Sequence, residues 1–179
     1  KVTADVEAGP VDLFASSGGA VNALALVAAH PEQVRTLVAH EPPLASILPD
    51  REGAMALTQA IADTYQLSGS GAGMAHFILA VSHQGPISPE FAAQPAPDPA
   101  MFGMPAEDDG TRIDPLLHQN IVSCTHYEPD FEGLRSVPTR IVMAAGVESA
   151  GQMAARGAAV MAERLGAGTG PGLVELAPL

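Results

Sequence analysis

Positive charge is scarce in this chain. Its 179 residues include eight Lys and Arg against twenty Asp and Glu, which gives a formal net charge of −12. A nucleic-acid surface needs clustered cations to contact phosphates, so we expect no nucleic-acid partner. An anionic membrane surface is disfavoured for the same reason. Solubility is the simplest interpretation of the acidic surplus.

Cysteine and long apolar runs are also scarce. The one cysteine, Cys124, can form no disulfide within the chain and offers no cysteine cluster for zinc or iron–sulfur. A lone thiol fits a reducing compartment, so we expect a cytoplasmic protein. No apolar run reaches the length of a membrane span, and the opening stretch KVTADVEAGP lacks a signal-peptide pattern. Because the chain starts abruptly, we expect a fragment or a processed product.

The two ends of the chain show the alternation of strand and helix that is typical of an α/β protein. Apolar runs at 11–15 and 34–43 predict buried strands, and the apolar stretch 18–30 between them predicts a buried helix. The same order of strand, helix and strand is predicted at 138–146, 149–166 and 173–177. Strands joined through helices in this way pair in parallel.

The middle of the chain, residues 44–134, has the pattern of a helical insertion. Apolar residues recur there at helical spacing in three stripes, which are Leu57, Ile61 and Tyr65; Met74, Phe77, Ile78 and Val81; and Ile113, Leu116, Leu117, Ile121 and Cys124. The Pro- and Gly-rich stretch 84–111 is longer than most loops of compact domains. The stretch 106–114 gathers four carboxylates. We favour an acidic loop in solvent over a cation site, because the spacing of a calcium loop is absent.

The stretch FASSGGAVNALALV, residues 14–27, joins a strand to a helix through two serines and two glycines. In a nucleophile elbow the nucleophile takes a strained conformation, and the residues two before and two after it approach closely. Ser17 meets the requirement for small neighbours with Ala15 and Gly19, whereas Ser16 would bring a phenylalanine into the turn. Ser17 is therefore the candidate nucleophile.

The N–H of Gly18 would then lie at the start of the helix, where it could donate to an oxyanion. Two alternatives stay open for this turn. One is a glycine-rich strand-to-helix connection without chemistry, and the other is a phosphate-binding loop. The second is disfavoured, because neither G-x-G-x-x-G nor G-K-[ST] occurs.

The stretch VDLFASSGGAVNALALVAAHPEQVRTLVAHEPPL resembles the elbow, the following helix and the next strand of the α/β-hydrolase family. The similarity continues through PTRIVMAAGVESAGQMAARGAAVMAERLG. The resemblance implies a hydrolase core at residues 1–43 and 135–179, with a helical cap at 44–134. The core would be a partial parallel sheet with flanking helices, the C-terminal half of the family's sheet. A serine hydrolase of this family uses Ser, an acid and His in that chain order, and we expect no cofactor.

The resemblance places the acid after the next core strand, where Glu148 stands. Its role would be to orient the histidine and to stabilise its cation. A structural alternative is that Ser149 and Gln152 form a capping box, with Glu148 placed favourably at the helix dipole. Glu41 ends the preceding strand, and some relatives place their acid there. We favour a structural strand end for Glu41.

The catalytic histidine is the missing part of this pattern. In the family it follows the last strand, and Leu179 ends the chain before any such residue. None of the histidines present fits that position; they are His30, His40, His76, His83, His118 and His126. We therefore expect the base to lie outside this chain. We also expect the exposed edge of the elbow strand to be covered by a missing segment or by a second copy.

The resulting prediction is a cap-bearing serine hydrolase that cleaves a small or medium carboxylic ester through an acyl-enzyme. Two alternatives remain. A cofactor-free perhydrolase or haloperoxidase-type activity would use the same residues. A non-catalytic fragment or interaction module would keep the fold without the base.

Overall fold

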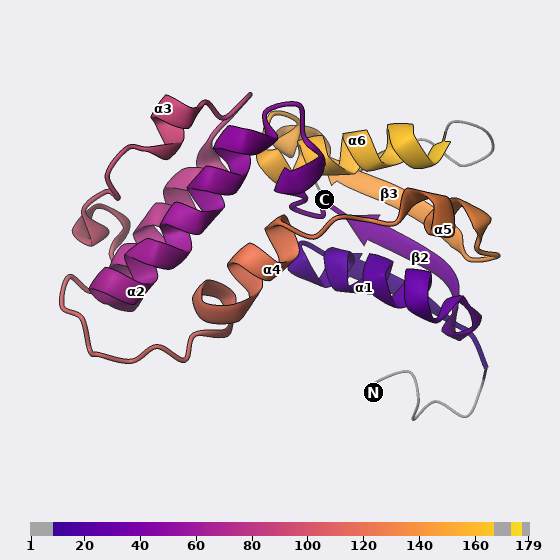
Figure 1. Ribbon diagram of the computed structural model, residues 1–179, viewed down its shortest axis with the longest axis horizontal. Coiled ribbons are helices and arrows are strands. Elements are labelled where there is room, and N and C mark those ends of the chain that lie inside the picture. The colour runs from indigo at the N-terminus through magenta and orange to yellow at the C-terminus, as the bar shows by residue number, and fades with distance from the viewer. Residues whose placement is uncertain (1–8, 167–172, 177–179) are drawn as a thin grey trace. The chain divides into compact units, whose positions relative to one another are not determined.

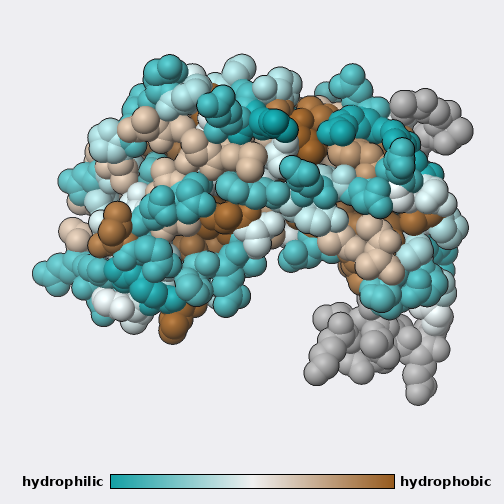
Figure 2. All heavy atoms as spheres, in the orientation of Figure 1, coloured by the Kyte–Doolittle hydropathy of each residue, from teal (hydrophilic) through white to brown (hydrophobic). Residues whose placement is uncertain are grey.

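The computed structural model describes residues 9–166 and 173–176 (Figure 1). Its contacts divide the chain into two compact units. The first unit takes in the described residues up to Pro43, Glu128–Ala150, and those from Ala154 onwards. The second unit comprises Leu44–Tyr127 and Gly151–Met153. Hydrophilic side chains cover much of both units on the face that Figure 2 shows, as the acidic composition leads one to expect.

A four-stranded parallel sheet forms the centre of the first unit. Its spatial order follows the chain: β1 (Val11–Ser16), β2 (Val34–His40), β3 (Arg140–Gly146) and β4 (Val174–Leu176). The predicted α/β class and parallel pairing are thus confirmed. Residue 177, the last of the predicted fourth strand, lies outside the described residues.

Three helices of the first unit connect or follow these strands: α1 (Gly18–Ala29), α5 (Phe131–Ser136) and α6 (Met153–Gly166). Right-handed crossovers between successive neighbours place such helices on one face of the sheet. In Figure 1, α5 lies between α1 and α6. The Arg135 guanidinium on α5 donates to the Arg164 carbonyl at 3.1 Å. The short 3-10 turn η1 (Pro31–Gln33) links α1 to β2.

The core between these layers consists of aliphatic and sulfur-containing side chains. Leu24 of α1, Leu37 of β2, Met143 of β3 and Met161 of α6 are all buried. Full burial of a side chain of this size stabilises the fold by about 1.5–3 kcal/mol. The apolar residues from which these strands and helices were predicted therefore also form the core that stabilises them.

The predicted start of the last helix is wrong. Residues Val147–Ser149 form a 3-10 turn, η5, and α6 begins only at Met153. Ser149 and Gln152 consequently form no capping box. The Gly151 carbonyl, which lies between the turn and the helix, accepts a hydrogen bond from the Gly85 N–H at 2.8 Å. This distant contact competes with helix formation and was not visible in the local sequence.

The second unit is helical. Its long helix α2 spans Arg51–Ser82 and is interrupted at Gly69, where φ is 83° and ψ −176°. The shorter elements are η2 (Ala45–Ile47), α3 (Pro89–Ala92), η3 (Pro99–Phe102), the π-helical turn η4 (Pro115–Asn120) and α4 (Ile121–Thr125). A Cβ atom at Gly69 would collide with the Asp108 carboxylate. Glycine is favoured at this kink by its positive φ, while the Asp108 carboxylate would have to move to admit a Cβ atom.

Only the first half of α2 buries the predicted stripe. Leu57, Ile61 and Tyr65 are buried, as expected. Beyond the kink, the expected stripe that includes Met74 is wrong, because the buried residues there are Gly71, Gly73, Ala75, His76 and Ala80. The two halves of the helix pack closely through glycine: a Cβ atom at Gly73 would lie 2.8 Å from the Tyr65 Cβ. Apolar periodicity cannot reveal a face built from small residues.

Among residues 9–166 and 173–176, no helix combines the length and the apolar character needed to cross a membrane.

Candidate active site

Ser17 lies between the last residue of β1 and the first residue of α1. Its φ of 55° and ψ of −133° belong to a region that costs a residue with a side chain about 1–3 kcal/mol. The Ser17 N–H donates to the His40 carbonyl at 2.9 Å, and the Ser17 carbonyl accepts from the Ala20 N–H at 2.9 Å. A strained serine that is held in this way, at a strand-to-helix turn, has the backbone geometry of a nucleophile elbow.

Backbone conformation, and not crowding, distinguishes the two serines. A Cβ atom on Gly19 would meet nothing within 4 Å, so the expected close approach of residues 15 and 19 is wrong. Ser16 is the last residue of β1 and pairs with His40 in the ladder. Among the described residues other than glycine, only Ser17 and Glu41 have a positive φ.

Gly18 is the first residue of α1, so its N–H lies at the positive end of the helix dipole. The first turn of α1 carries no acidic side chain that would offset this potential. The position therefore suits a developing negative charge. It is the position that the resemblance assigns to the oxyanion donor.

Glu148 lies in the turn η5, directly after β3, and its side chain is exposed. The carboxyl ends of parallel strands meet at one edge of a sheet. Ser17 follows β1 and Glu148 follows β3, so both lie at that edge, with the end of β2 between them. Because α6 starts at Met153, Glu148 is not at its N-terminus, and the helix-dipole alternative is not supported.

A series of polar contacts at the end of β2 was not predicted. The Ser16 hydroxyl lies 2.9 Å from His40 Nδ1, and His40 Nε2 lies 3.8 Å from Glu41 Oε1. The same Glu41 oxygen accepts a hydrogen bond from the Gly146 N–H at 2.9 Å. The sequence feature that could have predicted these contacts is the parallel order of the strands, because it places Ser16, His40 and Ala144 side by side in the sheet.

The six histidines lie in different parts of the chain, and in the part that the structure describes none of them hydrogen-bonds to the Ser17 hydroxyl. His40 bonds Ser16 instead. His76 is buried, at 2 % exposed, and its Nδ1 lies 3.0 Å from the Thr64 hydroxyl. Burial lowers the pKa of His76, because the charged imidazolium loses its hydration. His126 likewise bonds a threonine, Thr58, at 3.0 Å.

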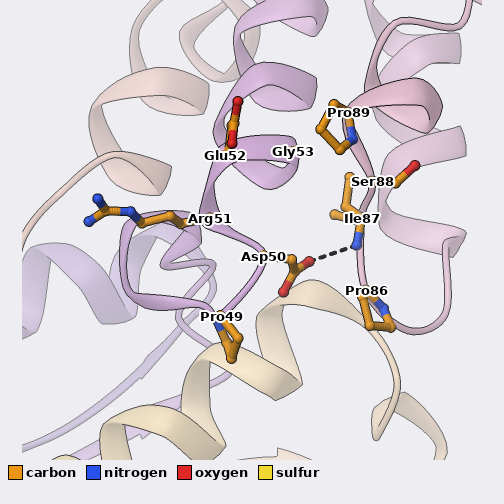
Figure 3. A pocket seen from close by; sticks show the side chains of 9 residues that line it. All are labelled: Pro49, Asp50, Arg51, Glu52, Gly53, Pro86, Ile87, Ser88 and Pro89. Carbon is orange, nitrogen blue, oxygen red and sulfur yellow. Dashed lines mark hydrogen bonds between the residues drawn. The ribbon is translucent and has the colours of Figure 1, made fainter.

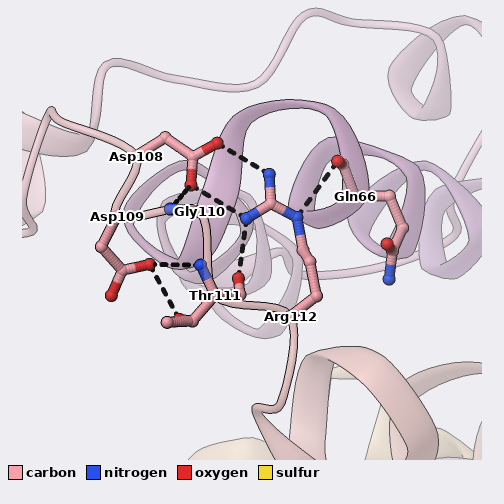
Figure 4. Close-up of polar contacts among 6 residues, drawn as sticks. All are labelled: Gln66, Asp108, Asp109, Gly110, Thr111 and Arg112. Carbon is pink, nitrogen blue, oxygen red and sulfur yellow. Dashed lines mark hydrogen bonds and ion pairs between the residues drawn. The ribbon is translucent and has the colours of Figure 1, made fainter.

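The acidic loop of the second unit is held by an arginine (Figure 4). Arg112 forms a two-pronged ion pair with Asp108, and its Nε donates to the Gln66 carbonyl at 3.1 Å. The hydrogen bonds from Arg112, with one from the Gly110 N–H, lower the pKa of Asp108 to about 2. Asp109 bonds Thr111. Within residues 9–166 and 173–176, no group of three or more His, Cys, Asp or Glu side chains could hold a metal ion.

An open pocket of about 460 Å³ also belongs to the second unit (Figure 3). Its lining residues are Pro49, Asp50, Arg51, Glu52, Gly53, Pro86, Ile87, Ser88 and Pro89. The Asp50 carboxylate accepts the Ile87 N–H at 2.6 Å, and the Ser88 hydroxyl accepts the Phe91 N–H at 3.2 Å. The Asp50 carboxylate thus holds the start of α2 to the segment before α3, and the Ser88 hydroxyl caps α3. No nucleophile and base meet among these nine residues.

Comparison with known proteins finds similarity at the level of structure. No protein-family model matches the sequence, and no curated protein matches it. The structure of a putative non-heme bromoperoxidase, BpoC, from Mycobacterium tuberculosis H37Rv aligns with 99 % of this chain at a TM-score of 0.56 and 15 % identity. The chain has an α/β-hydrolase fold.

The structure of Rv0554 from Mycobacterium tuberculosis aligns equally well with this chain, with a TM-score of 0.56 and 14 % identity. An α/β hydrolase from Sphaerobacter thermophilus DSM 20745 also matches, at a TM-score of 0.45 and 16 % identity over 95 % of the chain. The chain spans 61 %, 60 % and 60 % of the length of these three structures, respectively.

Proposed function

We propose that this chain carries the nucleophile of a serine hydrolase that cleaves a small or medium carboxylic ester. The observation that supports this proposal is the positive φ of Ser17 at the strand-to-helix turn. A strain of this kind persists only where the surrounding structure holds it, and it is concentrated at functional sites. Without a chemical role for Ser17, a glycine would occupy the same turn at a lower conformational cost.

In the proposed reaction the Ser17 Oγ attacks the ester carbonyl, and its proton passes to a histidine base. The Gly18 N–H binds the oxyanion of the tetrahedral intermediate. Collapse of the intermediate breaks the bond to the alcohol, which leaves with the proton from the histidine. Water then attacks the acyl-enzyme and releases the carboxylic acid. Glu148 orients the histidine and stabilises its cation.

We propose that the base comes from outside the described residues. The resemblance places it in the loop after the last strand, and none of the six histidines occupies that position. The second unit is proposed as the cap, and the edge of β1 as the contact for a further segment or a second copy. The lone Cys124, which is buried, is consistent with a cytoplasmic location.

A perhydrolase or haloperoxidase-type activity is the second candidate, and the similarity to a putative non-heme bromoperoxidase favours it. The same acyl-enzyme would react with hydrogen peroxide in place of water, and would release a peroxyacid. The two functions differ only in the acceptor of the acyl group. A non-catalytic module is the third possibility.

Kinetics of the complete protein separates these functions. With p-nitrophenyl acetate we expect release of nitrophenolate that is lost in Ser17→Ala. With acetate and hydrogen peroxide, formation of peracetic acid at a rate exceeding ester hydrolysis would favour the second candidate. If neither reaction depends on Ser17, the serine hydrolase proposal is wrong and the non-catalytic alternative is favoured.

A further inference from the structure

Glu41 is the second described residue, besides Ser17, that has a positive φ without being glycine. Its φ is 47°, and it follows directly after β2. The left-handed region disfavours a long side chain such as that of glutamate. Because this backbone conformation is unfavourable for glutamate, we expect Glu41 to make contacts that only this conformation allows.

That contact is made to the end of β3. The Glu41 N–H donates to the Ala144 carbonyl at 2.9 Å, and Glu41 Oε1 accepts from the Gly146 N–H at 2.9 Å. The side chain is 16 % exposed. A carboxylate acceptor that is shielded from water forms a stronger hydrogen bond than a neutral one. Glu41 therefore holds Gly146 in place through two hydrogen bonds to the end of β3, and the turn that carries Glu148 starts directly after Gly146.

His40, the residue before Glu41, holds the turn that carries Ser17 in place. The His40 carbonyl accepts from the Ser17 N–H at 2.9 Å, and His40 Nδ1 lies 2.9 Å from the Ser16 hydroxyl. The Phe14 ring stacks on the His40 imidazole with 6.1 Å between the ring centroids. Two consecutive residues at the end of β2 thus hold the two neighbouring strand ends, one on each side.

We propose that Glu41 is a positioning residue that fixes the turn carrying Glu148 relative to the elbow carrying Ser17. This inference rests on the proposed function of those two residues. The carboxylate accepts a hydrogen bond from the Gly146 N–H and lies 3.8 Å from His40 Nε2. It acts through the Gly146 N–H, and its left-handed backbone aims it at that N–H.

Two substitutions separate positioning from a direct catalytic role. Glu41→Gly keeps the left-handed backbone, which glycine adopts without strain, and removes the carboxylate. Glu41→Gln keeps an oxygen that can accept the Gly146 N–H but removes the charge. Glu32→Gln is the control, since it neutralises a carboxylate of the same unit whose side chain is 68 % exposed.

The measurement is the rate at which a fluorophosphonate probe labels Ser17 in the complete protein, as a function of pH. A misplacement of about 1 Å lowers rates by up to about 100-fold, so we expect Glu41→Gly to label about 10- to 100-fold more slowly. Glu41→Gln should restore a rate close to wild type with an unchanged pH profile. Equal rates in Glu41→Gly and wild type would overturn the inference. A Glu41→Gln variant as slow as Glu41→Gly would also overturn it, because the charge would then be required directly.

Amide hydrogen exchange supplies a readout that is independent of catalysis. We expect the Gly146 amide to exchange faster in Glu41→Gly than in the wild type, with protection restored in Glu41→Gln. If the wild type did not label at Ser17, the proposed function would fail, while the exchange data would still test the Glu41 contact. A Gly146 amide with unchanged protection in Glu41→Gly would refute that contact.

Discussion

Replacing Ser17 by glycine should make the protein more stable while it abolishes the proposed chemistry. Ser17 has φ 55° and ψ −133°, and its side chain forms no capping hydrogen bond to α1. Substitution therefore loses no cap. Glycine relieves the conformational strain, whereas alanine keeps a Cβ atom in the same strained position. The comparison of Ser17→Gly with Ser17→Ala isolates the backbone strain, because both variants lack the hydroxyl.

The expected difference follows from two opposing terms. Relief of the strain is worth about 1–3 kcal/mol, and the greater chain entropy of glycine in the unfolded state costs about 0.5–1 kcal/mol. At the middle of these ranges, about 2 and 0.75 kcal/mol, Ser17→Gly is more stable than Ser17→Ala by about 1 kcal/mol. For a chain of this size, 1 kcal/mol shifts Tm by about 2–4 °C. We therefore expect the glycine variant to melt about 2–4 °C higher.

Circular dichroism is the appropriate assay. The chain has no tryptophan, and its two tyrosines, Tyr65 and Tyr127, lie in the second unit. Intrinsic fluorescence would thus report the wrong unit. If Ser17→Gly melted at or below the temperature of Ser17→Ala, the turn would not be strained, and the structural argument for a nucleophile elbow would fail.

Three further predictions concern the rest of the chain. The pKa of Asp108 is lowered from 3.8 to about 2, so its ion pair with Arg112 stabilises the fold above pH 3.8 and is lost as pH falls through about 2. The free energy of unfolding in urea should depend less on pH in this window for Arg112→Gln than for the wild type, and an unchanged dependence would show that the ion pair does not stabilise the fold. Gly71→Ala brings a Cβ atom against the Pro105 carbonyl and should lower the free energy of unfolding by about 1–3 kcal/mol, whereas the Cβ of Gly19→Ala meets nothing within 4 Å and should not lower it. Equal urea midpoints for the two variants would contradict the close packing of Gly71. Cys124 is 4 % exposed, and burial raises the pKa of its thiol, so a thiol reagent should modify it only when the protein unfolds. Rapid modification of the folded protein would contradict the burial of Cys124.

The strands and the helices beside them could be predicted because their apolar runs are buried by the fold. Leu24 and Leu37 lie in such runs, and both are buried. The second half of α2 could not be predicted in this way. Its packing face contains Gly71 and Gly73, and glycine carries no hydrophobic signal although it permits the closest approach of helices.

The candidate site was predictable only where it is local in sequence. The strand, turn and helix around Ser16 and Ser17 are visible within a few residues, but the backbone conformation that distinguishes Ser17 is not. The contact of Glu41 with Gly146 joins residues 105 positions apart, and that of Ser16 with His40 joins residues 24 apart. Such contacts depend on the register of parallel strands. The register becomes visible only when the sheet is assembled.

The most direct test of the central claim is the site of covalent labelling. A fluorophosphonate probe is added to the complete protein, and the modified peptide is sequenced by mass spectrometry, with Ser16→Ala and Ser17→Ala in parallel. We predict that the label lies on Ser17 in the wild type and in Ser16→Ala, and that Ser17→Ala is not labelled. A label on Ser16, or a wild type that remains unlabelled, would contradict the assignment of Ser17 as the nucleophile.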